Sequence, residues 1–110
     1  MSLKVNPQAV AQALRLVEEG KYALNTVWTA NAPSEAQMTE FRRAHGDEAL
    51  YEWFLARDEK DQPVLPFGDF RRVHRSGVVA AKRYAEKSGD QGVIDAAESI
   101  LDLFDRMNAC

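Results

Sequence analysis

The sequence predicts a single all-α domain, a bundle of about five helices. Two observations carry this prediction: helix start and stop signals recur along the chain, and apolar residues recur at steps of three and four. The 110 residues suit one domain, 1–110, which is long enough to bury a core without a disulfide or metal. The predicted helices span residues 7–30, 34–45, 47–60, 69–88 and 90–107.

The first helix is expected to begin at Pro7, where a missing N–H costs nothing. An apolar stripe then runs through the segment in helical phase: Val10, Ala13, Leu14, Val17, Leu24, Val27 and Trp28. Because the stripe continues past Gly20, one long helix is favoured. A glycine in a helix interior costs roughly 1 kcal/mol against alanine, so a break at Gly20-Lys21 stays open as the alternative.

The second and third helices are marked by their first residues. Pro33 ends the first helix, and Ser34 with Gln37 makes a capping-box pattern for the second, which stops at His45-Gly46. Asp47 opens the third helix, whose apolar face is expected to be Leu50, Tyr51, Phe54 and Leu55, with Trp53 lying off that face. The charged residues 57–61 are expected to end it in solvent.

Residues 62–68 are expected to form an irregular loop, because Pro63 and Pro66 exclude a helix. The loop also contains Val64, Leu65 and Phe67, and an apolar loop usually lies against the core. Asp69 then opens the fourth helix, and the turn at 88–90 leads into the fifth. A turn this short predicts that the last two helices form an antiparallel hairpin.

Charge is distributed unevenly although the net charge is only −3. Residues 69–88 contain six basic and two acidic residues, whereas residues 90–110 contain one basic and five acidic residues. This opposition agrees with pairing of the two helices. Exposed ion pairs contribute only about 0–1 kcal/mol each, so the apolar stripes must supply most of the stability.

The favoured function is that of a non-enzymatic protein-interaction module. Trp53 points partly off the apolar face of its helix, and aromatic residues are enriched at interface anchors. One interpretation, slightly favoured, is that Trp53 packs under the loop. The other is an exposed patch that binds a partner protein or a second copy in a homodimer: Trp53, Val64, Leu65 and Phe67.

The alternative function is that of a nucleic-acid-associated regulator. Its phosphate contacts would come from the basic fourth helix: Arg71, Arg72, Arg75, Lys82 and Arg83. The sequence pI of about 5.4 makes this partner the less favoured one. A helix-turn-helix at residues 34–60 is also disfavoured, because Asp47, Glu48 and Glu52 would repel phosphates at the start of its recognition helix.

Other classes of function are not predicted. The chain has no glycine-rich phosphate loop, nucleophile elbow or zinc-binding helix pattern, so we expect no catalytic residue, no cofactor and no metal site. No apolar run approaches the roughly 20 residues of a membrane span. The absence of a secretory signal at the start of the sequence predicts a cytoplasmic location. Cys110 is the single cysteine, which excludes an intramolecular disulfide.

Overall fold

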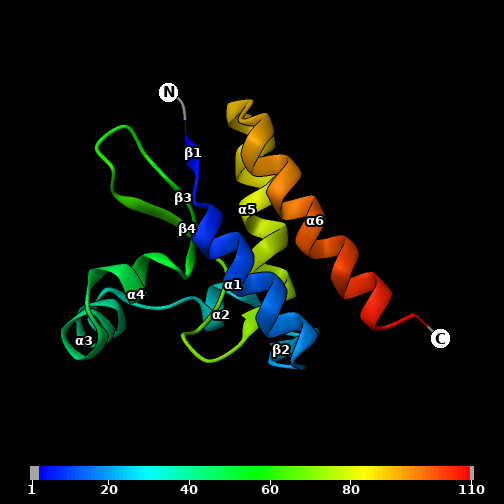
Figure 1. Cartoon of the computed structure of the whole chain (residues 1–110), viewed down its shortest axis with the longest axis horizontal. Helices are drawn as coiled ribbons and strands as arrows, with labels where there is room; N and C mark the ends of the chain where they lie inside the picture. The colour runs from blue at the N-terminus through cyan, green and yellow to red at the C-terminus, as the bar shows by residue number, and fades with distance from the viewer. Residues whose placement is uncertain (1–2, 110) are drawn as a thin grey trace.

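A computed structural model describes residues 3–109, and Cys110 lies outside this range. The described chain is mixed α/β (Figure 1), so the prediction of an all-α helical bundle is wrong. Its helices are α1 (Pro7–Glu18), α2 (Trp28–Asn31), α3 (Glu35–His45), α4 (Asp47–Tyr51), α5 (Arg75–Ser88) and α6 (Gln91–Met107). Its strands are β1 (Lys4–Val5), β2 (Tyr22–Ala23), β3 (Phe54–Arg57), β4 (Pro63–Pro66) and β5 (Val73–His74).

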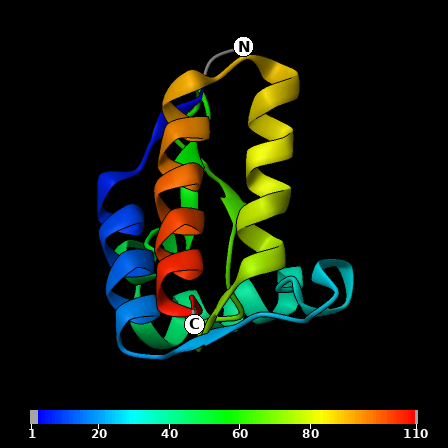
Figure 2. The ribbon, with the colours of Figure 1, turned by 90° about the vertical axis from the view of Figure 1, so that its right-hand side faces the viewer.

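The structure consists of a layer of helices packed against a small antiparallel sheet. The sheet has the order β1-β3-β4, and α1, α6 and α5 lie against one of its faces (Figure 2). The predicted hairpin of the last two helices is confirmed as α5 and α6. Gly89 ends α5 with a left-handed φ of +76°, where its N–H donates to the carbonyl of Ala85. The shared core lies between the two layers, and its largest fully buried side chains include Phe67, Phe104, Leu55 and Ile100.

The prediction of the third helix is correct only for its first turn. It stops after one turn, at Tyr51, and residues Phe54–Arg57 form the central strand of the sheet instead. Phe54, Leu55 and Ala56 are all buried, as expected for a strand covered on both faces. In β3, Ala56 pairs with Val5 on one side and with Val64 on the other, which satisfies backbone groups that a helix would have satisfied internally.

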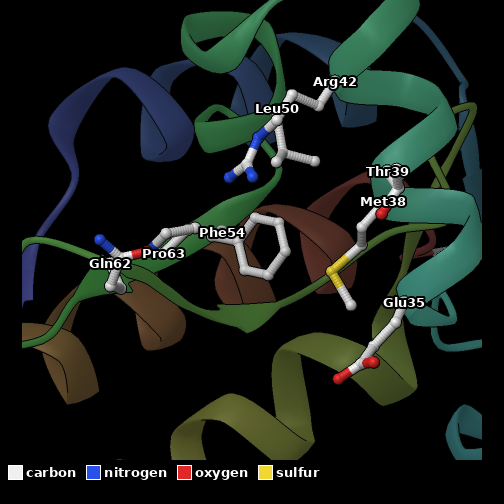
Figure 3. A pocket seen from close by; sticks show the side chains of 8 residues that line it. All are labelled: Glu35, Met38, Thr39, Arg42, Leu50, Phe54, Gln62 and Pro63. Atoms are coloured by element: carbon white, nitrogen blue, oxygen red, sulfur yellow. The ribbon is translucent and has the colours of Figure 1, made fainter.

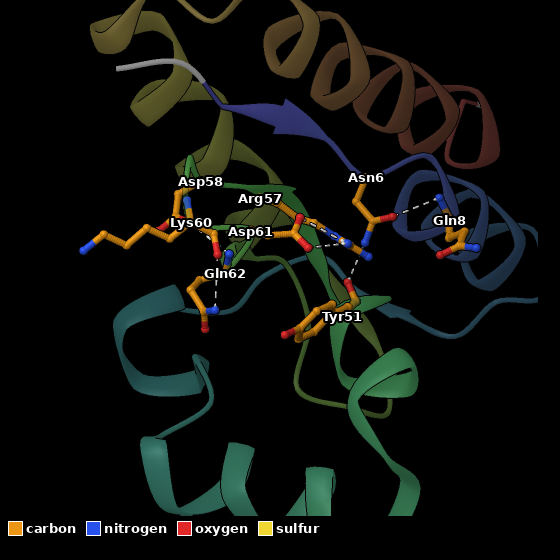
Figure 4. Close-up of polar contacts among 8 residues, drawn as sticks. All are labelled: Asn6, Gln8, Tyr51, Arg57, Asp58, Lys60, Asp61 and Gln62. Atoms are coloured by element: carbon orange, nitrogen blue, oxygen red, sulfur yellow. Dashed lines mark hydrogen bonds and ion pairs between the residues drawn. The ribbon is translucent and has the colours of Figure 1, made fainter.

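The charged residues after β3 form a hairpin loop rather than a helix end (Figure 4). One carboxylate oxygen of Asp58 accepts the backbone N–H groups of Lys60 at 2.9 Å and Gln62 at 3.0 Å. Asp61 adopts a left-handed φ of +62°, and its carboxylate pairs with Arg57 at 3.3 Å. The local hydrogen bonds of these short polar side chains therefore turn the chain back into β4.

The first predicted helix breaks at Gly20, so the alternative interpretation is the correct one. Gly20 has a φ of +80°, and the next residue, Lys21, donates its N–H to the carbonyl of Leu16 at 2.8 Å. The chain then enters β2, which pairs in parallel with β5. The fourth predicted helix begins at Arg75 rather than Asp69, because residues 69–74 form a turn followed by β5.

The start of α1 is tied to the middle of the chain through a buried asparagine. The side chain of Asn6 accepts the N–H of Gln8 at 3.2 Å and donates to the carbonyl of Tyr51 at 2.9 Å (Figure 4). Its backbone N–H donates to the carbonyl of Leu55. One residue thus caps the helix and fixes it against the end of α4 and the start of β3. No helix in the described range is both long and apolar enough to cross a membrane.

Candidate functional site

The predicted partner-binding patch contributes mostly to the core. Trp53 is 7% exposed and Phe67 is fully buried, with their ring centroids 6.0 Å apart. Val64 and Leu65 are half-buried on β4. Their burial leaves these four side chains little apolar area to offer to a partner.

Two of the predicted phosphate contacts face the acidic helix instead. Arg75 pairs with Asp105 at 3.6 Å, and Lys82 pairs with Glu98 at 3.7 Å. All four side chains keep substantial exposure to solvent, so each pair contributes at most about 1 kcal/mol. These pairs account for much of the opposition of charge between α5 and α6.

The other predicted contacts lie in different places. Arg71 and Arg72 belong to the turn before β5, where Oδ1 of Asp69 accepts their backbone N–H groups at 3.0 and 2.8 Å. Arg83 lies on α5, beside the same surface groove as Arg75. The structure therefore divides the five basic residues among a turn, the contact with α6 and a groove.

A buried histidine, His74, links three segments of the chain. The sequence predicted a helix cap or a surface residue among arginines, and the surface position is wrong. His74 is 3% exposed. Its Nε2 lies 2.9 Å from Oδ2 of Asp69, and its Nδ1 lies 2.8 Å from the hydroxyl of Thr26. That hydroxyl lies 3.2 Å from the hydroxyl of Ser76 at the start of α5. Hydrogen bonds therefore run without a gap from Asp69 to Ser76.

The carboxylate of Asp69 determines which group donates in each of these hydrogen bonds. An ionised carboxylate only accepts hydrogen bonds, so Nε2 of His74 must carry a proton and donate to Asp69. In a neutral ring Nδ1 then accepts from the hydroxyl of Thr26, which in turn accepts from Ser76. The arrangement gives every member a partner, which a buried polar group requires.

The pKa of Asp69 is held below its ordinary value of 3.8. Partial burial works in the opposite direction and would raise the pKa. The hydrogen bond from His74 and the backbone hydrogen bonds from Arg72 and Arg71 outweigh it, because each favours the ionised form.

Stability is therefore expected to fall in acid as Asp69 takes up a proton. Because the pKa of Asp69 is lower in the folded state than in the unfolded state, its ionised form stabilises the fold. This stability is present above the unfolded-state pKa, near 3.8, and is lost as the pH falls through the folded-state pKa. Urea unfolding from neutral pH down to acid should show that Asp69→Asn lowers stability most at neutral pH. The difference from the wild type should shrink below pH 3.8, because asparagine keeps an acceptor oxygen but never ionises. A difference that stays constant with pH would contradict this placement of Asp69.

An apolar groove lies between the chain around α2 and the first half of α5. Its volume is about 470 Å³, and its lining comprises Leu24, Val27, Trp28, Thr29, Arg75, Ser76, Val79, Ala80 and Arg83. Val27 is 66% exposed, and Leu24 is also exposed. Gly77 lets Trp28 lie close to α5, since a Cβ on Gly77 would fall 2.9 Å from Cζ3 of Trp28. We call this feature the α2–α5 groove.

A second hollow, which we call the aromatic hollow, lies on the other side of α2. Its volume is about 620 Å³. Its lining comprises Ala30, Asn31, Ala32, Gln37, Phe41, His45, Asp69, Phe70 and Arg71. Asp69 lines this hollow and Ser76 lines the α2–α5 groove, so the two ends of the hydrogen-bonded chain lie in the two features.

A third hollow, of about 300 Å³, lies between α3 and the β3–β4 hairpin (Figure 3). Met38, Leu50 and Phe54 form its apolar part. Arg42 lies at its edge but already pairs with Asp47, with 2.8 Å between Nε and Oδ1. Glu35 also lines this small hollow, which therefore combines an apolar surface with one exposed carboxylate.

Sequence reasoning missed the α2–α5 groove because it assigned Leu24 and Val27 to the core face of a long helix. The signal that identifies them was present in the sequence, at Gly20-Lys21. Because the helix ends before Gly20, the three-and-four spacing of apolar residues no longer predicts which side chains after it face the core. Leu24 and Val27 are therefore free to lie on the surface.

Comparisons with protein-family models, with curated proteins and with solved structures found no match to this chain. The geometry of its own residues therefore carries the functional conclusion.

Proposed function

We propose that this protein is a non-enzymatic, cytoplasmic protein-interaction module. Its α2–α5 groove binds a segment of a partner protein in which acidic residues lie beside apolar ones. The observation that carries the proposal is the exposure of Val27, an apolar residue that is 66% exposed and lines a concave surface. Exposed apolar residues around a hollow with a charged rim are typical of binding surfaces.

The apolar part of the groove supports affinity. Fully burying a valine or leucine side chain contributes roughly 1.5–3 kcal/mol relative to leaving it exposed. Val27 and Leu24 both retain exposed area that a partner side chain would remove from water. These two residues would supply the apolar part of the contact.

The arginines support the choice of an acidic partner. Arg83 is exposed and has no ion pair within residues 3–109, and Arg75 holds only a long contact with Asp105. A guanidinium group binds a carboxylate through paired hydrogen bonds and loses little hydration in doing so. A partner segment with Asp or Glu beside its apolar residues fits both parts of the groove.

Contacts that hold one side of the groove in place would reduce the entropic cost of binding. Trp28 is packed against Gly77, and the hydroxyls of Thr26 and Ser76 are held by His74 and by each other. A surface that is already ordered loses less freedom when a partner docks.

A different protein suits the groove better than a second copy does. A two-fold dimer places the same patch against itself, which would bring Arg75 and Arg83 of both copies together. Like charges facing each other across an interface cost binding energy. Homodimer formation stays a prediction, and light scattering at low and high salt tests it directly.

The test measures binding of a fluorescent amphipathic peptide with leucines on one face and glutamates on the other. We expect Val27→Asp to weaken binding at least tenfold, or about 1.4 kcal/mol, because it places a charge in the apolar contact. Tyr84→Asp is the matched control, since Tyr84 is 49% exposed on α5 but does not line the groove. Equal loss in both variants, or equal binding of a peptide with lysines in place of glutamates, would rule out the proposal.

A further inference from the structure

We propose that Ser76 selects the partner segment in the α2–α5 groove by accepting a hydrogen bond from one of its main-chain N–H groups. This inference rests on the function proposed for the groove and adds the hydrogen-bonding group that the partner must present. Ser76 is half-buried, lines the groove and ends the hydrogen-bonded chain that begins at Asp69. The direction of that chain decides what the hydroxyl of Ser76 can offer.

The number of hydroxyl protons determines the role of Ser76. Thr26 has one hydroxyl proton, and Nδ1 of His74 accepts it at 2.8 Å when Nε2 donates to Asp69. The contact of 3.2 Å between the two hydroxyls must then use the proton of Ser76. Within residues 3–109, Oγ of Ser76 makes no other hydrogen bond. It can therefore accept a hydrogen bond from a bound partner, but it has no proton left to donate to one.

The other polar side chains that line the groove are able to donate. The guanidinium groups of Arg75 and Arg83 and the indole of Trp28 donate hydrogen bonds and never accept them. The hydroxyl of Thr29 is exposed and can turn to do either. Among the described residues of the lining, Ser76 is therefore the one that needs a donor from the partner.

The arginines exclude a charged donor at this position. Arg75 is the direct neighbour of Ser76, and Arg83 lies on the same helix and lines the same groove. A lysine or arginine of the partner would meet like charge there, which costs binding energy. A neutral N–H avoids that cost, and the main chain supplies one at every residue except proline. Such a group is free to donate where a segment is extended or begins a helix.

Asp69→Asn is expected to reverse the chain and, with it, the role of Ser76. Two backbone N–H groups of the turn donate to Oδ1 of Asp69 at 3.0 and 2.8 Å, so the amide oxygen of asparagine should take that position. The amide nitrogen then faces Nε2 of His74, which must accept. Nδ1 now carries the ring proton and donates to Thr26, and the hydroxyl of Thr26 donates to Ser76. The proton of Ser76 is released to donate into the groove.

The experiment repeats the groove-binding measurement with peptides in which an ester oxygen replaces one main-chain N–H at a time. It is run at about pH 8, where histidine is ordinarily neutral. In the wild type, an ester at the position that faces Ser76 should weaken binding about tenfold, because a lone pair replaces the donor. In Ser76→Ala the same ester should weaken binding less than twofold. Thr29→Ala is the matched control, since it removes another hydroxyl of the lining and should keep the tenfold effect.

The nitrogen chemical shifts of the His74 ring test the direction of the chain without any peptide. The wild type should carry the ring proton on Nε2, whereas Asp69→Asn should carry it on Nδ1 and reduce the ester effect below twofold. Thr26→Val is the second variant, because it has a similar shape but cannot accept the proton of Ser76. It should reduce the ester effect in the same way.

The outcomes separate this proposal from the function proposed for the groove. A wild-type ring proton on Nδ1, or ester effects that are equal in the wild type and Ser76→Ala, would overturn the selection by Ser76 while peptide binding itself persists. Failure of every peptide to bind would overturn the proposed function of the groove, and the selection with it.

Discussion

Phe67→Ala is expected to lower the free energy of unfolding by about 3–5 kcal/mol, as removal of a fully buried phenylalanine side chain does. The ring packs on Trp53 and lies within the shared core. The backbone of Phe67 is hydrogen-bonded at both of its polar groups. Its N–H donates to the carbonyl of Trp53, and its carbonyl accepts the N–H of His74 at 2.9 Å. Domains of this kind are stable by only about 5–15 kcal/mol, so urea unfolding should show a large loss.

Val27→Ala is the matched comparison, because Val27 is an apolar residue that faces solvent. Its removal should change stability by less than about 0.5 kcal/mol. The pair also tests the sequence-based hypothesis that Phe67 belongs to a partner-binding patch. A Phe67→Ala variant that keeps full stability and loses self-association would favour that hypothesis over the buried position.

Gly68→Ala is also expected to destabilise the protein, although it adds only one methyl group. An alanine Cβ there would lie 2.5 Å from the carbonyl oxygen of Arg72 and 2.5 Å from Cζ3 of Trp53. The carbonyl cannot withdraw freely, because it accepts the N–H of Asp69 at 3.2 Å. The strain should cost about 1–3 kcal/mol, and urea unfolding followed by tryptophan fluorescence should report both the loss and the displacement of the Trp53 ring.

Gly92→Ala provides the control for that prediction. Gly92 lies in the first turn of α6, and its nearest neighbour would be Cγ2 of Val5 at an ordinary 3.4 Å. Alanine is the better helix former by up to about 1 kcal/mol, so this variant should be neutral or more stable. Similar losses at both glycines would mean that the close approach at Gly68 does not hold in solution.

Elements governed by local interactions were predictable from the sequence. Ser34 and Gln37 form the predicted capping box, with hydrogen bonds of 3.1 Å and 2.9 Å, and α3 runs from Glu35 to His45. The turn at Gly89 and the apolar stripe of α6 similarly predicted the final hairpin. In each case the interactions that decide the structure lie within about four residues of one another.

The central strand was not predictable in the same way. Its residues continue the apolar spacing that begins at Leu50 in the helix predicted from Asp47, and a short apolar run suits either structure. Pairing with β1 on one edge and with β4 on the other makes these residues a strand. Residue Val5 of β1 lies about fifty positions away from its partner Ala56, so no local pattern reports the pairing.

The candidate sites depended even more on distant contacts. The basic residues of 69–88 looked like one helical surface, but β5 and the turn before it separate Arg71 and Arg72 from the rest. His74 looked like a surface residue among arginines. Its burial required Thr26, which lies 48 positions away in the chain.

The sequence by itself determined the start of α1 at Pro7, the capping box of α3, the turn at Gly89, the final hairpin, and the opposition of charge between its two helices. These features follow from hydrogen bonds and apolar spacing within a few residues. Only the tertiary structure decided that Phe54–Arg57 is a strand, that Trp53 and Phe67 are buried, and that Asp69, His74, Thr26 and Ser76 meet. The physical reason is that backbone pairing and burial are satisfied by whichever distant segment packs alongside, and local residue patterns do not specify that segment.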